Sequence, residues 1–446
     1  MIYIGIDIGT TTICAVAADS VSGAAVESVT SENNTFMEGQ PFERLQDPEA
    51  ILRKAMGLIE HFTQKYDVGG IGITGQMHGI VYIDGDGSSA SPLYIWQDGR
   101  GDLPYKDGMT YAQYVAKSTG GKAASGYGGV THFYNTVNDL VPAQAKTFCT
   151  IHDYLAMKLT GRLTPAVHPS DAASFGCYDI KNNRFDAEIM DTSFFPEVEV
   201  GKKIIGKTAS GIPVSAAIGD NQASFIGSVR EPDSSILINV GTGSQISVMS
   251  REAVETDNIE ARPFDSGTFL SVGASLCGGR AYALIKDFFD EIITKATGQS
   301  CKGLYDVMDG MGEAAYESGG IVEVDTRFGG TRHDTSIRGG ITGIGLDNFT
   351  PGAFAAGVQQ GMANELYNLY SEVKSNVKPQ RIIGSGNGIR KNKLLQRIVS
   401  EKFGLPLFIP KFNEEAAFGA ALFAMSGTGE FETLAQAQKI INLIEV

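Results

Sequence analysis

The motif Ile-Asp-Ile-Gly-Thr-Thr at residues 6–11 has a similar counterpart, Ile-Asn-Val-Gly-Thr-Gly, at residues 238–243. This internal repeat decides the fold. In both places an apolar run meets Gly-Thr, and a second apolar run follows, at residues 13–18 and 246–249. The pattern predicts a strand, a tight turn and a second strand. The two copies are offset by 239 − 7 = 232 residues, about half of the 446-residue chain, so the repeat indicates two domains of similar structure.

Strand and helix signals alternate around the two predicted hairpins. Asp47-Pro48-Glu49 is typical of a helix start, and apolar residues follow it at helical spacing. The remaining signals predict strands at 70–73 and 214–219 and helices at 354–369 and 390–403, the last ending at Gly404. Such alternation indicates α/β layers. We expect domains at 1–228 and 229–446, since residues 230–233 break the pattern.

The amino-acid composition indicates which classes of binding partner are unfavourable. The chain has 36 basic and 51 acidic side chains, a formal net charge of −15, which disfavours binding to nucleic acid or to a membrane surface. The five cysteines lie at least 24 positions apart, so the sequence predicts no Cys-x-x-Cys metal or redox site and no disulfide framework. The chain opens directly into a strand-like run, and the expected location is the cytoplasm.

The two Gly-Thr turns have the composition of a phosphate site. Glycine lets the backbone approach a ligand closely, and consecutive amides with Thr hydroxyls form an anion-binding concavity. Asp7, just before the first turn, is suited to hold Mg²⁺ through water. Either turn alone is more simply an ordinary hairpin, but the pair favours a polyphosphate held from both sides.

A nucleotide site of the Walker type is not predicted, because the chain has no Gly-x-x-x-x-Gly-Lys-Ser/Thr stretch. Gly384-Ser385-Gly386-Asn387-Gly388 follows an apolar pair and precedes a predicted helix. Such a loop suits an adenine or a ribose at a helix N-terminus. A glycine-rich turn between strand and helix explains the same residues equally well.

Asp220 is the candidate catalytic residue. It lies between a buried strand at 214–219 and a predicted helix, which is where ligands bind in α/β sheets. Phosphoryl transfer needs in-line positioning, charge stabilisation and a carboxylate that takes the hydroxyl proton. Asp is also a frequent helix N-cap, and the sequence leaves both roles open.

Two polar loops are candidates for binding the acceptor. One is Gln76-Met77-His78, and the other is Trp96-Gln97-Asp98-Gly99-Arg100, which carries the only tryptophan. Paired donors and acceptors beside an apolar face are what a polyhydroxylated sugar needs. His78 and Trp96 can equally be structural, and the spacing of the six histidines predicts no zinc site.

Taken in order, these motifs resemble the FGGY carbohydrate kinases. The resemblance extends over almost the whole chain and also includes Arg338-Gly339 and the Ala-rich stretch 416–421. It implies an α/β fold of two ribonuclease-H-like domains, of the actin-like ATPase superfamily, with an active-site cleft between the domains. It further implies ATP and Mg²⁺ as cofactors and a small ketose as substrate.

Residue roles follow from the same resemblance. Asp220 would be the general base, and Asp7 and Asp220 would be the metal-linked carboxylates. The sugar contacts would be Gln76, Met77, His78, Gln97, Asp98, Arg100 and Asn221. The ATP contacts would be Thr10, Thr11, Gly241, Thr242, Gly243, Gly384, Gly386 and Asn387.

The choice of sugar is less defined. The 96–100 loop and Gly126-Tyr127-Gly128-Gly129-Val130-Thr131 look most like sedoheptulokinases, which makes sedoheptulose the favoured substrate. D-xylulose, another pentulose or a polyol is the alternative, since Thr131-His132-Phe133-Tyr134 stands where xylulose and glycerol kinases carry a Lys before a Trp. A homodimer is compatible with the resemblance.

Two other classes share part of the pattern. An actin- or chaperone-type ATPase would carry both phosphate turns but would not need the loops at 76–78 and 96–100. A catalytically silent sugar-binding regulator is expected to have lost its base, whereas Asp7 and Asp220 are both present. The sequence therefore favours a kinase.

Overall fold

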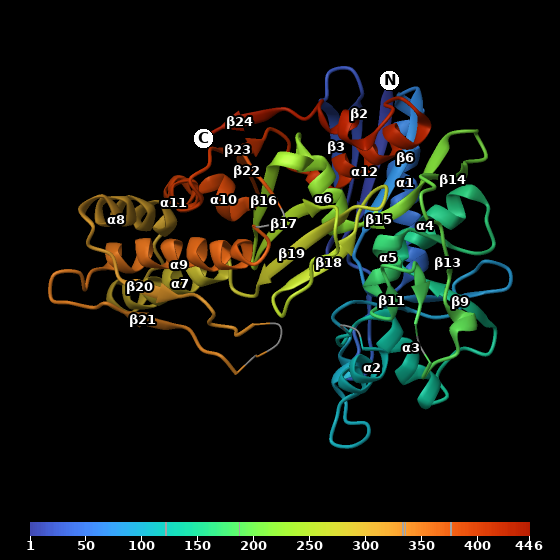
Figure 1. Ribbon diagram of the computed structural model, residues 1–446, viewed down its shortest axis with the longest axis horizontal. Coiled ribbons are helices and arrows are strands. Elements are labelled where there is room, and N and C mark those ends of the chain that lie inside the picture. The colour runs from blue at the N-terminus through green and yellow to red at the C-terminus, as the bar shows by residue number, and fades with distance from the viewer. Residues whose placement is uncertain (121–122, 187, 332–333, 335, 375–376) are drawn as a thin grey trace. The chain divides into compact units, whose positions relative to one another are not determined.

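The computed structural model describes residues 1–120, 123–186, 188–331, 334, 336–374 and 377–446 (Figure 1). The chain forms two compact units. The first comprises 1–230, 262–267 and 414–442, and the second comprises 231–261, 268–413 and 443–446. The domains expected from sequence were contiguous, whereas the units exchange segments, because the helix at 415–428 packs on the sheet of the first unit.

The first unit is built on a six-stranded sheet in the order β14-β15-β6-β1-β2-β3. β1 and β2 pair antiparallel through the Gly-Thr turn, so the first predicted hairpin is confirmed. β6 runs parallel to β1 on one side and to β15 on the other. The strands are β1 (Ile2–Ile8), β2 (Thr12–Asp19), β3 (Ala25–Glu32), β6 (Val68–Gly75), β14 (Ile204–Lys207) and β15 (Pro213–Gly219).

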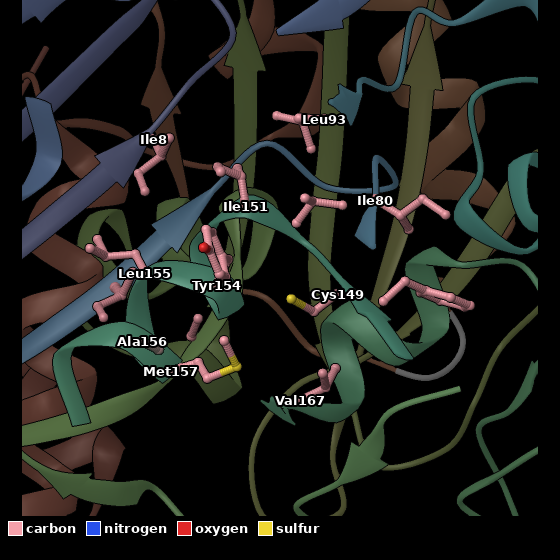
Figure 2. Packing of buried hydrophobic residues seen from close by; sticks show 14 of the residues in the cluster. Ile8, Ile80, Leu93, Cys149, Ile151, Tyr154, Leu155, Ala156, Met157 and Val167 are labelled. Carbon is pink, nitrogen blue, oxygen red and sulfur yellow. The ribbon is translucent and has the colours of Figure 1, made fainter. Parts of the chain in front are cut away.

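Helices cover this sheet. Helix α1 (Pro48–Lys65) begins as predicted, with the Asp47 side chain accepting from the amides of Glu49 and Ala50. The apolar residues read as its inner face are all buried: Ile51, Leu52, Ala55, Ile59 and Phe62. Figure 2 shows part of the same core, where Ile8 of β1 lies among side chains such as Tyr154 and Leu155 of α4 (Ile151–Thr160).

Helix α12 (Glu415–Thr428) lies directly on β1 and β6, as Figure 1 shows for the red helix and the blue strands. Glycines permit this approach: a Cβ on Gly5 would lie 1.8 Å from the carbonyl oxygen of Ala417, and one on Gly72 would lie 1.8 Å from that of Ala420. The backbone of α12 therefore rests on the backbone of the sheet.

The remaining elements of the first unit are shorter. Its helices are α2 (Tyr111–Thr119), α3 (Gly128–Val137), α5 (Pro169–Ser174), α6 (Asp220–Ser228) and α13 (Leu434–Gln438), with 3₁₀ turns at Gly99–Asp102 and Thr192–Phe194. Its small sheets use β4 (Phe36–Met37), β5 (Leu45–Gln46), β7 (Val81–Asp84), β8 (Leu93–Tyr94), β9 (Ala145–Cys149), β10 (Ala166–Val167), β11 (Tyr178–Asp179), β12 (Arg184–Phe185) and β13 (Glu197–Val198).

The second unit has a seven-stranded sheet in the order β18-β19-β17-β16-β22-β23-β24. β16 and β17 pair antiparallel, which confirms the second predicted hairpin, and β22 runs parallel to β16. The strands are β16 (Ser235–Val240), β17 (Ser244–Ser250), β18 (Ile259–Pro263), β19 (Phe269–Ser275), β22 (Arg381–Ser385), β23 (Leu407–Pro410) and β24 (Leu443–Glu445), and β20 (Glu323–Asp325) pairs with β21 (Gly340–Thr342).

Both helices predicted for the second unit are present. The helix expected at 354–369 is α9 (Pro351–Ser371). The helix expected at about 390–403 is α11 (Lys393–Phe403), which ends at Gly404 as predicted. It begins later than expected, because Asn392 separates it from α10 (Asn387–Lys391) and caps α11 through the amide of Leu395 at 2.8 Å. The others are α7 (Gly279–Thr297), α8 (Leu304–Ser318) and a 3₁₀ turn at Pro232–Ser234. Over the described residues, no helix is both long and apolar enough to cross a membrane.

Candidate active site

Three parallel strands of the first unit end at the same level. Ile8 of β1 pairs in register with Gly75 of β6, and Gly75 pairs with Gly219 of β15. Asp7, the 76–78 loop and Asp220 belong to these strand ends, so the register brings three separately predicted elements to one edge of the sheet. The carboxyl edge of parallel strands is the usual place for a ligand in an α/β unit.

Carboxylates gather at this edge. Burial, together with the negative charges of Asp220 and Glu414, raises the pKa of Asp7 to about 7. Glu414 immediately precedes α12, and no motif of the sequence pointed to it. Like charges that meet in a partly dry site favour a bound cation or a shared proton.

Asp220 is the first residue of α6, and the N-cap position is taken by Gly219. Its side chain is exposed to solvent, yet the surrounding protein is dense enough that desolvation raises its pKa. Arg262 and His152 act in the opposite direction and favour the charged form. The result is a carboxylate that is reachable from solvent and a stronger proton acceptor than an ordinary Asp.

This chemistry fits Mg²⁺. The ion prefers oxygen ligands, keeps several waters and is commonly held through one or two carboxylates. Asp7 and Asp220 supply those oxygens, and their mutual repulsion is what a divalent cation relieves. The cluster accordingly has both the donor type and the charge for the ion.

A chain of side-chain hydrogen bonds holds the first Gly-Thr turn. The Thr10 hydroxyl donates to Oε1 of Gln76 at 3.0 Å, and Nε2 of Gln76 donates to Oε1 of Gln46 at 2.9 Å. Gln46 closes the ring by donating to the Thr10 carbonyl at 2.9 Å. Nε1 of Trp96 donates to the Thr10 hydroxyl at 3.0 Å. Gln76 is buried in this ring, while Thr11 is exposed at the turn.

The 77–78 segment lies beside the strand end that carries Asp220. Met77 is buried with its sulfur against Gly219, the residue before Asp220. His78 has a positive φ of 74° and stacks on Tyr127, with the rings 4.2 Å apart and nearly parallel. Asn221, one residue after Asp220, is buried. The structure thus groups Met77, His78 and Asn221 around Asp220.

The 96–100 loop divides into two parts. Trp96 and Gln97 are exposed, whereas Asp98 and Arg100 are each 1% exposed. Arg100 donates through Nε to Asp98 at 2.6 Å and lies over the ring of Tyr94. Asp98 also accepts from the Arg44 amide at 3.0 Å. This placement favours a role for Asp98 and Arg100 in holding the loop over direct contact with a sugar.

A buried group of ionisable side chains lies behind the sheet edge, and the sequence motifs did not point to it. Nε2 of His152 is 3.0 Å from Oδ1 of Asp171, and both side chains are fully buried. With Asp153, the group offers three ligand atoms within 4.8 Å of one another, the spacing of a cation site, although the direct contact already pairs His152 with Asp171. Asp171 stands in the first turn of α5, so its local pattern is that of any helix start.

The second unit carries the other Gly-Thr turn. The Gly241 amide donates to the Gly243 carbonyl at 2.9 Å, and the first amides of α7 donate to the carbonyls of Gly241 and Thr242. On the neighbouring strand, the Ser385 hydroxyl accepts from Nδ2 of Asn239 at 2.9 Å. These contacts tie the turn to the loop that follows β22.

A cavity of about 900 Å³ opens beside this turn. It is lined by four predicted ATP contacts, Gly241, Thr242, Gly386 and Asn387, and by apolar and aromatic residues that include Ala283 and Tyr282. Gly243 packs against Ser275, and Gly384 lies inside β22 against Ile409. The volume suits a nucleoside. A larger cavity, about 1020 Å³, has a charged lining that includes Glu323, Glu365 and Arg338.

Comparison with known proteins identifies the family of the chain. The N-terminal domain of the FGGY family of carbohydrate kinases matches residues 2–227, and the C-terminal domain of that family matches residues 236–428. Sedoheptulokinase of Homo sapiens is 25% identical over 94% of this chain and 96% of its own. Xylulose kinase of Staphylococcus xylosus is also 25% identical, over 96% of this chain and 92% of its own.

Solved structures match the fold. Xylulose kinase from Rhodospirillum rubrum superposes with a TM-score of 0.85 at 19% identity, covering 100% of this chain and 94% of that one. Gluconate kinase from Lactobacillus acidophilus gives 0.84 at 20% identity, covering 99% and 92%. The predicted α/β fold of two domains is therefore confirmed. The chain belongs to the FGGY family of carbohydrate kinases and is an ATP-dependent sugar kinase.

Proposed function

We propose that the chain phosphorylates a terminal hydroxyl of a small ketose, with Asp220 as general base. The observation that supports the proposal is the common register of Ile8, Gly75 and Gly219, because Asp7, the 76–78 loop and Asp220 all belong to the strand ends that this register aligns. An ATPase without an acceptor would not need the polar loop.

In this proposal Asp220 accepts the proton of the attacking hydroxyl, and its raised pKa supports that task. Met77, His78, Asn221 and the exposed Gln97 orient the sugar. Asp7, with Asp220, would hold Mg²⁺, which supplies charge neutralisation at the phosphates. In the second unit, Gly241 and Thr242 receive phosphate, while the 900 Å³ cavity receives the nucleoside beside Gly386 and Asn387.

Sedoheptulose is the favoured acceptor, with its 7-phosphate as product. The proposal is supported by the 96–100 and 126–131 stretches and by the full-length similarity to sedoheptulokinase. D-xylulose is the competing acceptor, since xylulose kinase matches at the same identity. A screen of D-xylulose, D-ribulose, D-fructose, sedoheptulose and polyols, read as ADP release and as sugar phosphate formed, decides between them. Strong ADP release without sugar phosphate would refute the kinase role.

The test of mechanism is Asp220→Asn. Removing the proton acceptor should lower kcat by about 10²–10⁴-fold while the ketose still binds. Asp287→Asn, a change of the same type on the exposed face of α7, is the matched control and should keep wild-type turnover. Near-normal phosphorylation by Asp220→Asn would show that Asp220 is not the base.

A further inference from the structure

The short helix α5 (Pro169–Ser174) contacts two loops of the active site through two serines. Oγ of Ser170 accepts a hydrogen bond from the amide of Gly219 at 3.1 Å, and Gly219 is the residue before Asp220. Oγ of Ser174 accepts from the amide of His78 at 3.2 Å. One turn of helix thus reaches both the base and the sugar-facing loop.

The direction of the Ser170 hydroxyl is determined by His168. Burial lowers the pKa of His168 to about 4, so the ring is neutral near pH 7. Its Nδ1 accepts from the Ser170 amide at 3.2 Å and is therefore unprotonated, which makes the Ser170 hydroxyl the donor in the 2.8 Å contact with Nδ1. The Ser170 oxygen is left to accept from the amide of Gly219. Rotation of the hydroxyl would break its hydrogen bond to Nδ1 of His168.

Ser174 follows the same pattern on the other loop. Its hydroxyl donates to the carbonyl of Asp171 at 2.7 Å, so its oxygen accepts from His78. The Ser174 carbonyl also accepts from Nδ1 of His78 at 2.9 Å, which makes Nε2 the acceptor nitrogen of the ring. Since His78 has a positive φ, a conformation that costs non-glycine residues free energy, these bonds hold it in place.

The helix itself is fixed from behind. Asp171, between the two serines, meets His152 of α4 at 3.0 Å in a fully buried contact. A shift of α5 would separate these two polar groups and leave each of them buried without the other, which costs free energy and holds the helix in place. A fixed helix can transmit position to the loops that it holds.

We propose that Ser170 and Ser174 are separate positioning residues of the kinase reaction. Ser170 acts through Gly219 on Asp220 and therefore on turnover. Ser174 acts through His78 on the bound ketose and therefore on its affinity. This inference rests on the proposed function, because it needs Asp220 as the base and His78 at the sugar.

The two alanine variants should therefore fail in different ways. Ser170→Ala should lower kcat about tenfold with the KM for the ketose near its wild-type value, because the base is displaced while the sugar contacts stay. Ser174→Ala should raise the KM for the ketose about tenfold with kcat near its wild-type value. A merely structural role for both serines would move stability without dividing the kinetic parameters.

Ser91→Ala is the matched control. Oγ of Ser91 accepts from the Tyr82 amide at 3.0 Å and donates to the Pro92 carbonyl at 2.7 Å, the same bonding pattern away from both loops. It should lose similar stability in a thermal melt and keep both kinetic parameters. If an alanine variant does not fold, the corresponding Ser→Cys variant replaces it, because cysteine has a similar volume and is a weaker hydrogen-bond acceptor. The cysteine variants should change the same kinetic parameter as the alanine variants, kcat for Ser170 and KM for Ser174, by a smaller factor.

The kinetics are measured at saturating ATP with the ketose that the wild type phosphorylates best. The inference is supported if Ser170→Ala lowers kcat alone and Ser174→Ala raises the KM for the ketose alone. Equal effects of both variants on one parameter, or wild-type kinetics in both, overturn it while the proposed function stands. A wild-type chain that phosphorylates no ketose, or an active Asp220→Asn variant, instead overturns the proposed function and this inference with it.

Discussion

The contact between α6 and α12 allows a prediction whose size follows from the coordinates. A Cβ on Gly419 would lie 1.9 Å from the carbonyl oxygen of Ala223 and 2.7 Å from the amide nitrogen of Gly227. Both neighbours are backbone atoms, so rotation of a side chain cannot relieve the overlap. Since such contacts do not fall below 3.0 Å, Gly419→Ala must separate the two helices by at least about 1.1 Å there.

This displacement reaches the proposed general base, because α6 begins at Asp220. Misplacing a catalytic group by about 1 Å costs on the order of 10²-fold in rate. Overpacking a close contact costs about 1–3 kcal/mol of unfolding free energy, and each kcal/mol lowers Tm by about 1–2 °C in a chain of this size. We therefore expect Gly419→Ala to lower kcat about 10²-fold and Tm by roughly 1–6 °C.

Gly57→Ala is the control. Gly57 is an exposed residue inside α1, and a Cβ there meets nothing within 4 Å. Alanine is a better helix former than glycine, so this variant should gain about 0.5–1 kcal/mol and keep the wild-type kcat. Steady-state kinetics with a thermal melt measure both variants. Wild-type kcat and Tm in Gly419→Ala would refute the close contact and its link to Asp220.

Three further predictions concern charge and the nucleotide. The folded state holds a proton on Asp7 between about pH 4 and 7 that the unfolded chain has released, so unfolding free energy falls as pH rises through this range. Mg²⁺ should therefore raise Tm more at pH 8 than at pH 6, and Asp7→Asn should remove the difference. Burial lowers the pKa of His132 and of His168 to about 4, so stability should fall as pH drops from 6.5 to 4, by roughly 3 kcal/mol for each ring. His132→Gln should flatten that acid limb in urea titrations at pH 4.5 and 7. Finally, Ala283→Trp, which places a bulky side chain in the cavity of about 900 Å³, should raise the KM for ATP more than tenfold, and an unchanged KM would place the nucleoside elsewhere.

Local signals explain what the sequence predicted well. The hairpin at β1–β2 and the start of α1 depend on residues that are neighbours in the chain, such as the Asp47 cap and the apolar run behind it. The break at Asn392 escaped prediction because an asparagine inside an apolar helical pattern is ordinary until its side chain is seen to cap the next helix.

The missed site residues depend on contacts between distant segments. Glu414 reaches Asp7 because α12 returns to a sheet made more than three hundred residues earlier, and Arg262 reaches Asp220 from the segment 262–267. The burial of polar side chains could not be predicted from the sequence either. Asp98 and Arg100 pair locally, two residues apart, but the sequence does not show that the packed chain buries this ion pair almost completely.

The same alternation that builds β1 also explains why packing and chemistry are coupled at this site. Successive residues of a strand point to opposite faces, so Gly5 and Asp7 lie on one face while Ile4, Ile6 and Ile8 lie on the other. Gly5 lets α12 approach, and the helix begins just after Glu414, whose charge raises the pKa of Asp7. A side chain at position 5 would push α12 outward and carry Glu414 away from Asp7. The acidic character of this edge therefore depends on a glycine that contacts no substrate.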